Sequence, residues 1–497
     1  MVETIQEPPR ETPVLREVDV LVVGGSQSGV AAAVCAKRAA PSLNVLLVEQ
    51  LGYLGGQSVA DMVIHWEFRE YTNNSGVDVA AGIGKEMIQR IVAKGNSDPL
   101  YSAWLEGRGP PFTEFADPRA VGDIPLDLED IKLVLLEMCE EAGVEVLFLA
   151  KAVAALPLDT STTLPASRGI IVETYNGRYA IKAKVVVDCS ANNDVAWFVG
   201  GTDAVEIPPP MMTMQAYLWI GGVDCMKFVE AAWEPPVSFG ICYPNNKEQM
   251  VEFVKNNMSI TLRGGGEYMN QIEERWPTLL EDYENLGAIA NIAYWLKTNK
   301  TRKFGDTYIG TWAVEGPNYR WDQVDYESVS KVHASLVKAC QLMLKMHQVL
   351  PGWENAYIER TPDRIGFRQT RVLKGLYAMT SDDILKSASF EDKVGHACGH
   401  DQSRGKLDVE MGYDIPYRAL VPAAIDGLLV AARSISCEVA DPKLLALNAS
   451  RGISATIIAG QAAGTAAALS VAAGVEPRNL DVPQLQEELR HQNVLFP

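Results

Sequence analysis

Apolar runs and short breaks follow one another regularly near the start of the chain. Residues 18–23 form an almost continuous apolar run, which is typical of a buried strand, and the small residues 30–36 predict a tightly packed helix. Pro41 ends this helix, and a second apolar run at 45–48 leads directly into Glu49. The pattern therefore predicts a strand, a turn, a helix and a second parallel strand, in this order.

The turn between the first strand and the helix is rich in glycine. Gly24 permits a tight bend, Gly29 lets the helix and strand backbones approach closely, and the start of the helix offers free N–H groups to a pyrophosphate. Ser26 replaces the middle glycine of the G-x-G-x-x-G pattern, and its hydroxyl can donate to a phosphate oxygen. Glu49 lies about twenty residues further on, where a carboxylate accepts hydrogen bonds from an adenosine ribose. An ordinary strand-to-helix turn also contains glycines, but the complete pattern favours a dinucleotide site. The expected contacts are those of Gly24, Gly25, Ser26, Gln27, Ser28, Gly29, Glu49 and Gln50.

A second glycine pair distinguishes between the dinucleotides. Gly55 and Gly56, followed by Gln57 and Ser58, come too soon after Glu49 for another strand and helix, so the chain must turn back close to the cofactor. In this feature the chain resembles the FAD-dependent oxidoreductases of the glutathione-reductase-like superfamily, in the branch related to fumarate reductase flavoproteins. The resemblance implies that all four residues lie close to FAD. It also implies that FAD is bound without a covalent bond, because relatives with covalent flavin have a histidine at this place.

Motifs further along the chain are similar to those of one FAD-dependent oxidoreductase family. The segment 185–196 resembles a strand followed by "DATGDGDVA", with Ala191 and Asn193 in place of two glycines. The segments 365–371, 413–422 and 428–436 resemble "IGIRETR", "YxIPYRxLVP" and "NLLVAGRxIS", the last with Ala432 in place of glycine. The resemblance implies further cofactor contacts at Val153, Asp188, Asn192, Arg433, Ile453 and Ser454.

The segment 455–473 consists almost wholly of small and apolar residues. Its length and lack of charge suit a membrane span, but its glutamine, serines, threonines and glycines favour a buried helix instead. Gly460, Gly464 and Ala468 give this helix a smooth face for close packing on a sheet. Its positive N-terminal end is available to a developing negative charge, and in the resembled family that end faces the flavin pyrimidine.

Composition and charge narrow the classes of protein. A chain of 497 residues with 47% hydrophobic residues predicts a globular protein of two or three compact units. The net charge of −19 argues against nucleic-acid partners and against anionic membrane surfaces. Residues 1–17 are expected to form a disordered tail without the pattern of a signal peptide. The eight cysteines have no regular spacing, which favours reduced thiols and a cytoplasmic location.

The positions of the cofactor motifs predict the domain organisation. Residues 18–204 and 412–497 carry these motifs and are expected to form one discontinuous α/β domain, Rossmann-like, with a parallel sheet, helices and a β-meander. Helices are expected at 83–93 and 128–142 within it. Residues 205–411 are expected to form an inserted α+β substrate or cap domain, which begins with a strand at 211–220.

Two arginines are candidates for the chemistry of the substrate pocket. Arg368 and Arg371 lie in a motif of the resembled family and could hold a substrate carboxylate or stabilise an anionic flavin. They face the same side only if the segment is helical. Structural salt bridges to the many carboxylates of an acidic protein would explain them equally well.

Histidines supply further candidates. His396, Cys398 and His400 resemble a metal-ligand segment of zinc-dependent hydrolases, but the glutamates and the final histidine of that pattern are missing, so no metal is expected. His396 or His400 could act as a general base near the flavin, or both could be surface residues of a loop. His65, which follows the second glycine pair, either lines the substrate pocket or is a core histidine.

The expected reaction follows from these motifs. No second strand–glycine–helix unit is recognisable, because Gly264, Gly265 and Gly266 lack flanking apolar elements, so the electrons should come from the substrate itself. We therefore expect an FAD-dependent dehydrogenase or oxidase that removes a hydride from a small organic substrate and passes the electrons to oxygen or an external acceptor. A flavin monooxygenase that uses free NAD(P)H is one alternative. A zinc-dependent hydrolase at His396, Cys398 and His400 is an alternative of another class.

Overall fold

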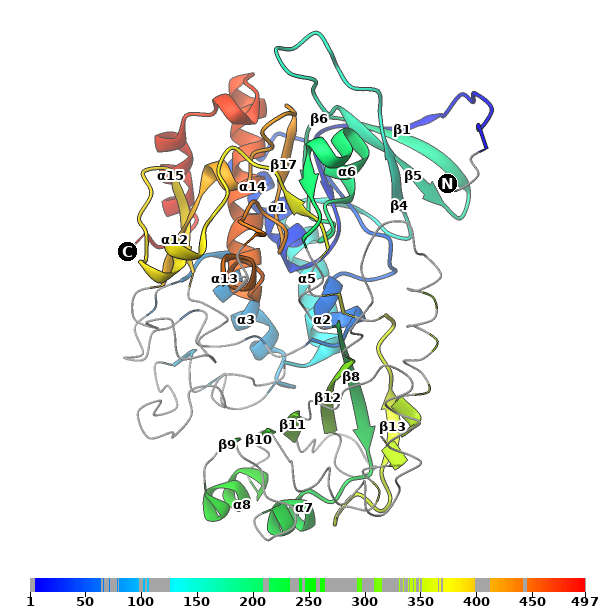
Figure 1. Ribbon diagram of the computed structural model, residues 1–497, viewed down its shortest axis with the longest axis vertical. Helices are drawn as coiled ribbons and strands as arrows, with labels where there is room; N and C mark the ends of the chain where they lie inside the picture. Colours follow the sequence, from blue (N-terminus) through cyan, green and yellow to red (C-terminus); the bar gives the residue numbers. More distant parts are fainter. Residues whose placement is uncertain are drawn as a thin grey trace.

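A seven-stranded sheet forms the centre of the upper of two bodies in Figure 1. The computed structural model describes residues 5–63, 126–208, 371–397, 412–440 and 445–496, together with parts of the segments between them. The order across the sheet is β3 (Glu145–Leu147), β2 (Val45–Val48), β1 (Val14–Val23), β6 (Gly177–Asp188), β5 (Gly169–Thr174) and β4 (Lys151–Ala155), and β17 (Leu428–Val430) also pairs with β6.

The sheet combines a parallel core with an antiparallel extension. β1, β2, β3, β6 and β17 are parallel, whereas β4, β5 and β6 form an antiparallel meander. In the register, Val20 lies opposite Val45 on one side and Val185 on the other, so apolar side chains stand next to one another across the sheet. The predicted α/β fold with a parallel sheet and a meander is confirmed.

Two helices with small residues pack directly against each other beside this sheet. They are α1 (Gln27–Ala39) and α14 (Ile453–Ala473). A Cβ atom on Gly460 would lie 2.2 Å from the Ser28 carbonyl oxygen, and one on Gly464 would lie 1.9 Å from that of Ala32. The smooth face predicted for 455–473 therefore serves mainly to pack α14 on α1, although α14 also contacts β1 and β6.

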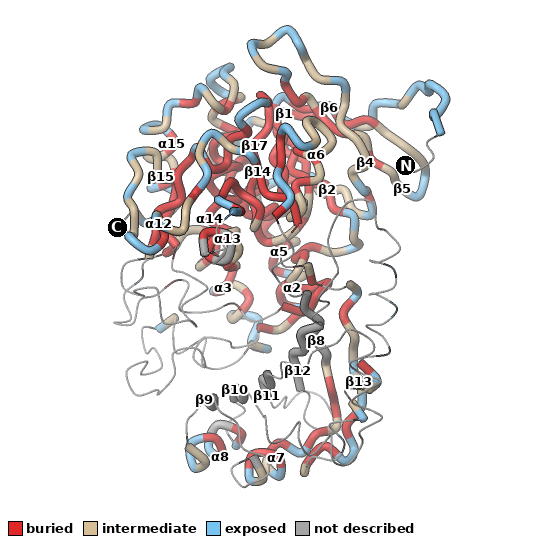
Figure 2. The backbone as a smooth tube through the Cα atoms, viewed as in Figure 1, coloured by how far each residue is buried: buried red, intermediate tan, exposed pale blue. Residues whose placement is uncertain are grey.

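The apolar helix α14 is a core helix of this body. Among the described residues it is the one helix long and apolar enough to span a membrane, and most of it is buried inside the protein. Figure 2 shows buried residues gathered around α14, α1 and the sheet. The predicted helices 83–93 and 128–142 are confirmed as α3 (Ile83–Ala93) and α5 (Leu128–Ala142), which contact each other and α1.

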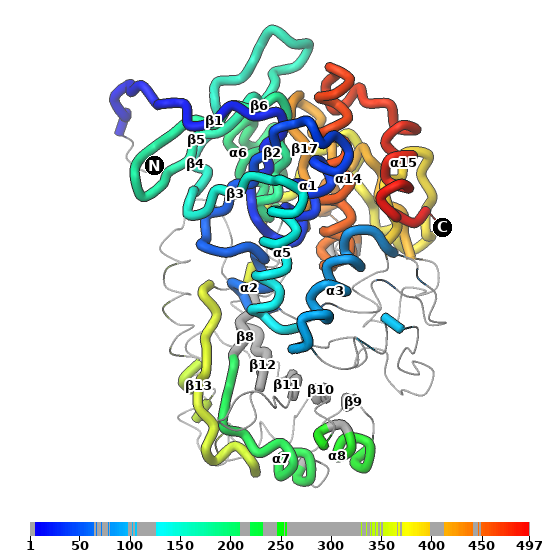
Figure 3. Tube along the Cα trace, turned by 180° about the vertical axis from the view of Figure 1, so that it is seen from behind, coloured from blue at the N-terminus to red at the C-terminus, as the bar shows by residue number. Residues whose placement is uncertain are grey.

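A second sheet of six antiparallel strands forms the lower body. Figure 3, seen from behind, shows the same separation from the first sheet. The order is β13 (Tyr357–Arg360), β8 (Met214–Gly221), β12 (Tyr308–Val314), β11 (Ala293–Leu296), β10 (Ile260–Arg263) and β9 (Ile241–Tyr243), and α7 (Cys225–Ala232) and α8 (Lys247–Lys255) lie beside it. The expected strand at 211–220 corresponds to β8.

Two boundaries differ from those expected from the sequence. β1 already begins at Val14, so residues 14–17 belong to the sheet and not to a disordered tail. β14 (Val372–Leu373) pairs with β7 (Val205–Glu206), and β15 (Lys393–Ala397) pairs with β16 (Tyr413–Pro416). Because apolar side chains of both β14 and β15 are buried in the upper body, the chain returns to that body near residue 371 and not at 412.

Candidate functional site

The glycine turn between β1 and α1 brings three segments into close contact. Gly24 has φ +104°, and a Cβ atom there would lie 2.5 Å from the Cys189 carbonyl oxygen at the end of β6. A Cβ atom on Gly29 would lie 1.8 Å from the Gly24 oxygen. The tight bend at Gly24 and the close approach at Gly29 therefore occur as the sequence predicts.

The second glycine pair lies directly against the first turn. The Gly55 N–H donates to the Gly25 oxygen over 2.8 Å. Gly56 begins the short helix α2 (Gly56–Ala60), and a Cβ atom on it would lie 2.7 Å from the Cβ atom of Ser26. Residues of the two turns therefore form one continuous wall.

Side-chain hydrogen bonds also connect these two turns. The Gln27 amide donates to the Ser58 hydroxyl, which also accepts a hydrogen bond from the Trp66 indole over 2.9 Å. All three side chains are buried. These contacts hold α2 against the start of α1.

The Glu49 carboxylate is fixed by backbone donors. One oxygen accepts from the Gly25 N–H over 2.6 Å and the other from the Leu51 N–H over 2.7 Å. Burial raises the pKa of Glu49, while these hydrogen bonds and the charge of Arg364 oppose the shift. Each carboxylate oxygen has a further lone pair, so Glu49 can still accept from a ligand hydroxyl.

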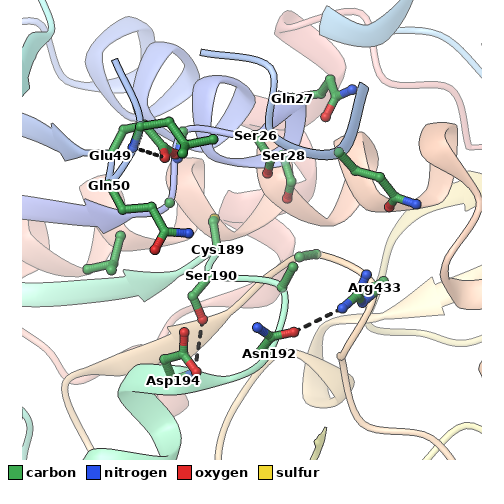
Figure 4. A pocket seen from close by; sticks show the side chains of 18 of the residues that line it. Ser26, Gln27, Ser28, Glu49, Gln50, Cys189, Ser190, Asn192, Asp194 and Arg433 are labelled. Atoms are coloured by element: carbon green, nitrogen blue, oxygen red, sulfur yellow. Dashed lines mark hydrogen bonds between the residues drawn. The ribbon is translucent and has the colours of Figure 1, made fainter. Parts of the chain in front are cut away.

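The segment after β6 forms the opposite wall. Asp188 is buried and accepts from the N–H groups of Ser190 and Ala196, both over 3.0 Å, so it holds the turn that leads into α6 (Asp194–Gly200). Asn192 extends from this turn, and its side-chain amide oxygen accepts from an Arg433 nitrogen over 2.9 Å. Figure 4 shows this pair.

Three residues that replace motif glycines keep a backbone conformation that favours glycine. Ala191, Asn193 and Ala432 have φ values of 67°, 53° and 122°. The side-chain amide of Asn193 donates to the Ser434 carbonyl oxygen, and the Ser434 hydroxyl donates back to its amide oxygen. The replacements therefore preserve the course of the chain, at a cost in backbone strain for the two alanines.

These walls enclose a cavity of about 480 Å³. Two helices begin at it, α1 after Ser26 and α14 after Gly452, and neither has a side-chain cap on its first N–H groups. Ile453 and Thr456 from the first turn of α14 line the cavity. Both helix ends therefore present a positive dipole end to an anionic ligand.

Charged side chains in the cavity wall are partly paired. Arg364 Nε donates to the Asp61 carboxylate over 2.6 Å. Burial raises the pKa of Asp61, and Arg364 opposes this shift. Burial, and then the charge of Asp188, raises the pKa of Asp194 to about 6, although Arg371 lies 2.9 Å from its carboxylate.

Arg433 is a partly buried cation without a carboxylate partner among the described residues. Burial lowers its pKa to about 10, and its Nε atom has no hydrogen-bond partner. Asn192, a neutral residue, accepts from its other end. An anion in the cavity would compensate this positive charge.

Most of the predicted cofactor residues meet at this cavity. It is lined by Gly24, Gly25, Ser26, Gln27, Ser28, Glu49, Gln50, Gly56, Gln57, Ser58, Asn192, Arg433 and Ile453. The lining does not include Gly29, Gly55, Val153, Asp188 or Ser454. Gly29 and Asp188 lie behind the lining residues. Gly29 allows the close approach within the glycine turn, and Asp188 holds the turn before α6. Val153 lies at an irregularity of the β4–β5 pairing, where Lys151 and Ala152 line the cavity instead.

Sequence reasoning missed several residues of the lining. They are Asp61, Lys151, Asp194, Arg364, Phe367, Arg451 and Thr456. Asp61 stands four residues after Gln57, so helical spacing could have indicated it. Arg364 immediately precedes the motif at 365–371, but no local pattern marks it as part of the cavity.

The candidate catalytic residues are not brought together among the described residues. Arg371 pairs with Asp194 and stacks on the Trp197 ring, 4.8 Å from its centroid, outside the lining. His396 is buried in β15, where its Nδ1 lies 2.8 Å from an Asp414 oxygen, and it does not line the cavity either. His65, Arg368, Cys398, His400 and the glycines 264–266 lie outside the described residues. Within the described part of the chain, no group of three histidine, cysteine or acidic residues could hold a metal ion.

Comparisons with known proteins agree with the motifs. A family model described as FAD dependent oxidoreductase matches residues 19–489. No curated protein sequence matches the chain.

Similar solved structures share only weak sequence identity with the chain. A triple mutant of the flavin-dependent brominase Bmp2 is 12% identical, with a TM-score of 0.43, and the match covers 96% of this chain and 85% of that one. A geranylgeranyl bacteriochlorophyll reductase-like protein from Thermoplasma acidophilum is 12% identical, with a TM-score of 0.40 and coverages of 96% and 83%. The anhydrotetracycline hydroxylase OxyS from Streptomyces rimosus is 12% identical, with a TM-score of 0.41 and coverages of 96% and 65%.

Proposed function

This chain belongs to the FAD dependent oxidoreductase family, and we propose that it oxidises a small organic substrate by removing a hydride. FAD supplies the hydride acceptor when it is bound, and oxygen or an external acceptor is the proposed final oxidant. The cavity between the glycine turns and the start of α14 carries this proposal, because most of the cofactor contacts expected from the motifs converge on it.

One end of the cavity fits the adenosine diphosphate half of FAD. Glu49 is held by backbone donors and keeps lone pairs for ribose hydroxyls. The uncapped start of α1 offers N–H groups to phosphate oxygens. The close approach of Gly56 to Ser26 shows how tightly the two turns define this wall.

The other end fits the flavin half. Arg433 brings a partly buried positive charge, and the start of α14 adds a second positive end. Both would stabilise the negative charge that the flavin pyrimidine gains on reduction. We therefore assign Arg433 and the first turn of α14 to the redox end of the cavity.

The proposal also includes how FAD is attached and to which superfamily the chain is related. Gln57 and Ser58 lack the nucleophilic side chain of a histidine, which supports non-covalent FAD at this turn. The second glycine pair at Gly55 and Gly56 supports a place in the glutathione-reductase-like superfamily, near the fumarate reductase flavoproteins.

Anaerobic titration of the purified yellow protein with amines, alcohols and hydroxy acids tests the proposed reaction. We expect one of these classes to bleach the flavin absorbance without a nicotinamide cofactor. Bleaching that requires NADPH would support the monooxygenase with free NAD(P)H instead. A colourless protein that binds no added FAD and contains stoichiometric zinc would overturn the flavoenzyme and favour the hydrolase.

A pair of variants locates the reaction in the cavity. Arg433→Gln should slow the bleaching while FAD still binds, because the positive charge at the redox end is lost. Arg418→Gln is the matched control, since Arg418 is half-exposed and pairs with Asp392 outside the cavity lining. Equal bleaching rates in the two variants would remove Arg433 from the redox end.

A further inference from the structure

The lower body reaches the cavity through the segment that follows β13. The Asp363 N–H donates to the Ala60 carbonyl oxygen at the end of α2 over 2.8 Å, and the Tyr53 hydroxyl donates to the Asp363 carboxylate. The next residue, Arg364, donates its Nε to Asp61 over 2.6 Å. Residues from the lower body are thus attached directly to the second glycine turn.

The two partners of the Arg364–Asp61 pair differ in exposure. The Asp61 side chain is 3% exposed, whereas that of Arg364 is 37% exposed and lines the cavity. Asp61 is the one hydrogen-bond or ion-pair partner found for Arg364 among the described residues. Because only Nε is engaged, the two terminal nitrogens are available to an anion in the cavity.

The position of Arg364 along the cavity identifies this anion. Tyr53, whose hydroxyl donates to the Asp363 carboxylate, stands between Glu49 and Gly55 in the chain. The residue before Arg364 therefore lies beside the segment that joins Glu49 to the second glycine turn. Asp61 also directly follows α2, whose first residue packs on the glycine turn at Ser26. Arg364 therefore lines the cavity beside the second glycine turn, which packs on the turn that would receive phosphates.

We propose that Arg364 binds the diphosphate of FAD with its terminal nitrogens while Asp61 holds its Nε, so that the cofactor joins the lower body to the upper one. The inference rests on the proposed FAD site. A guanidinium group suits this double role, because its planar donors can serve a carboxylate on one edge and phosphate oxygens on the other. Cofactor binding then strengthens a junction that the apoprotein holds through Asp61, Ala60 and Tyr53.

Binding of ADP and adenosine to the apoprotein tests this role without any turnover. Both ligands are measured by competition against FAD, whose fluorescence reports binding. In Arg364→Ala we expect the ADP affinity to fall about ten- to a hundredfold, the usual effect of losing a charge-assisted hydrogen bond. The adenosine affinity should stay nearly unchanged, because adenosine carries no phosphate.

Arg360→Ala is the matched control for this variant. Arg360 lies in the same segment and pairs with Asp363 over 3.3 Å, but it does not line the cavity. Its loss should leave the ratio of ADP to adenosine affinity unchanged. If Arg364→Ala does not fold, the double variant Arg364→Gln/Asp61→Asn replaces it, because it removes both charges of the pair together. The ratio of ADP to adenosine affinity should fall in this variant as well.

Hydrogen exchange gives a second, independent measurement. ADP should slow exchange in residues 357–364 of the natural protein and have much less effect there in Arg364→Ala. An unchanged ADP-to-adenosine ratio in the variant overturns the inference, and so does a variant that keeps its ADP affinity but is no longer reduced by an anionic substrate. If the natural protein binds neither FAD nor ADP, the proposed function itself fails.

Discussion

A Cβ atom on Gly56 would lie 2.7 Å from the Cβ atom of Ser26. Ser26 stands where the glycine motif has its middle glycine, and Gly56 belongs to the second glycine pair. The second turn therefore leaves space for the side chain that the first turn has gained.

Gly56→Ala should lower the free energy of unfolding of the apoprotein by about 1–3 kcal/mol, because the new methyl group overlaps Ser26. FAD affinity should fall with it, since both residues line the cavity. In the double variant Ser26→Gly/Gly56→Ala the loss should be smaller than in Gly56→Ala alone, because the overlapping atom is gone. Denaturant unfolding of the natural protein, of Ser26→Gly, of Gly56→Ala and of the double variant measures this coupling.

Gly474→Ala separates steric overlap from backbone strain. Gly474, which follows α14, has the left-handed conformation with φ +67° and ψ 32°, but a Cβ atom there meets nothing within 4 Å. Its replacement should cost only the strain of the left-handed conformation, about 1 kcal/mol. A loss in Gly56→Ala no larger than this would show that Ser26 does not restrict Gly56.

The replaced glycines show how far sequence motifs predict local structure. Asn192 and Arg433, which the motifs mark as cofactor contacts, both line the cavity, because strand and turn order determine where these segments meet. The motifs could not indicate whether Ala191 and Ala432 alter the backbone conformation or keep a strained positive φ, since the sequence is compatible with both outcomes. The positive φ values show that the tertiary contacts of the turns prevail over the preference of alanine.

Ala432→Gly should stabilise the protein, because Ala432 has φ 122°, a conformation that costs alanine about 1–3 kcal/mol. Part of this gain is offset by the greater freedom of glycine in the unfolded chain, so we expect a net increase of about 1 kcal/mol. A higher midpoint of thermal unfolding measures it. The neighbouring Ala431→Gly is the control and should destabilise, since Ala431 is fully buried and has no positive φ. A lower midpoint in Ala432→Gly would contradict the strain.

The Asp194 carboxyl group should make the stability of the apoprotein depend on pH. Burial, with Asp188 nearby, raises its pKa from the ordinary 3.8 to about 6. Between these values the folded protein holds a proton that the unfolded chain has lost, so this contribution to stability is present at low pH and disappears as the pH rises through 6. The side chain is 37% exposed, and solvent screening limits the effect to about 1 kcal/mol.

Asp194→Asn should remove this part of the pH dependence. Unfolding free energies measured between pH 4 and 7 should fall more steeply with pH in the natural protein than in the variant. Asp203→Asn, on the exposed turn after α6, should retain the natural slope. Parallel curves for Asp194→Asn and the natural protein would show that Asp194 has no raised pKa.

Long-range side-chain partners were beyond sequence reasoning. The order of strands, the glycine turns and the buried helix α14 follow from local patterns, and they were predicted. Asp61 and Arg364 are 303 positions apart, and the motif containing His396 does not reveal that Asp414 lies opposite it on the next strand. Such pairs depend on how separate segments dock, which periodicity does not encode.

His396 should therefore contribute to stability and not to the reaction. Burial would raise the pKa of Asp414, but the hydrogen bonds from His396 and Ser389 lower it overall, so the charged carboxylate depends on these partners. His396→Gln should lower the free energy of unfolding by about 1–3 kcal/mol, because Asp414 loses a buried hydrogen bond. FAD affinity and anaerobic bleaching should remain as in the natural protein, since His396 does not line the cavity. His491→Gln, at the exposed end of α15 (Val482–His491), should change neither quantity. A stable His396→Gln protein that no longer bleaches would restore His396 as a catalytic candidate.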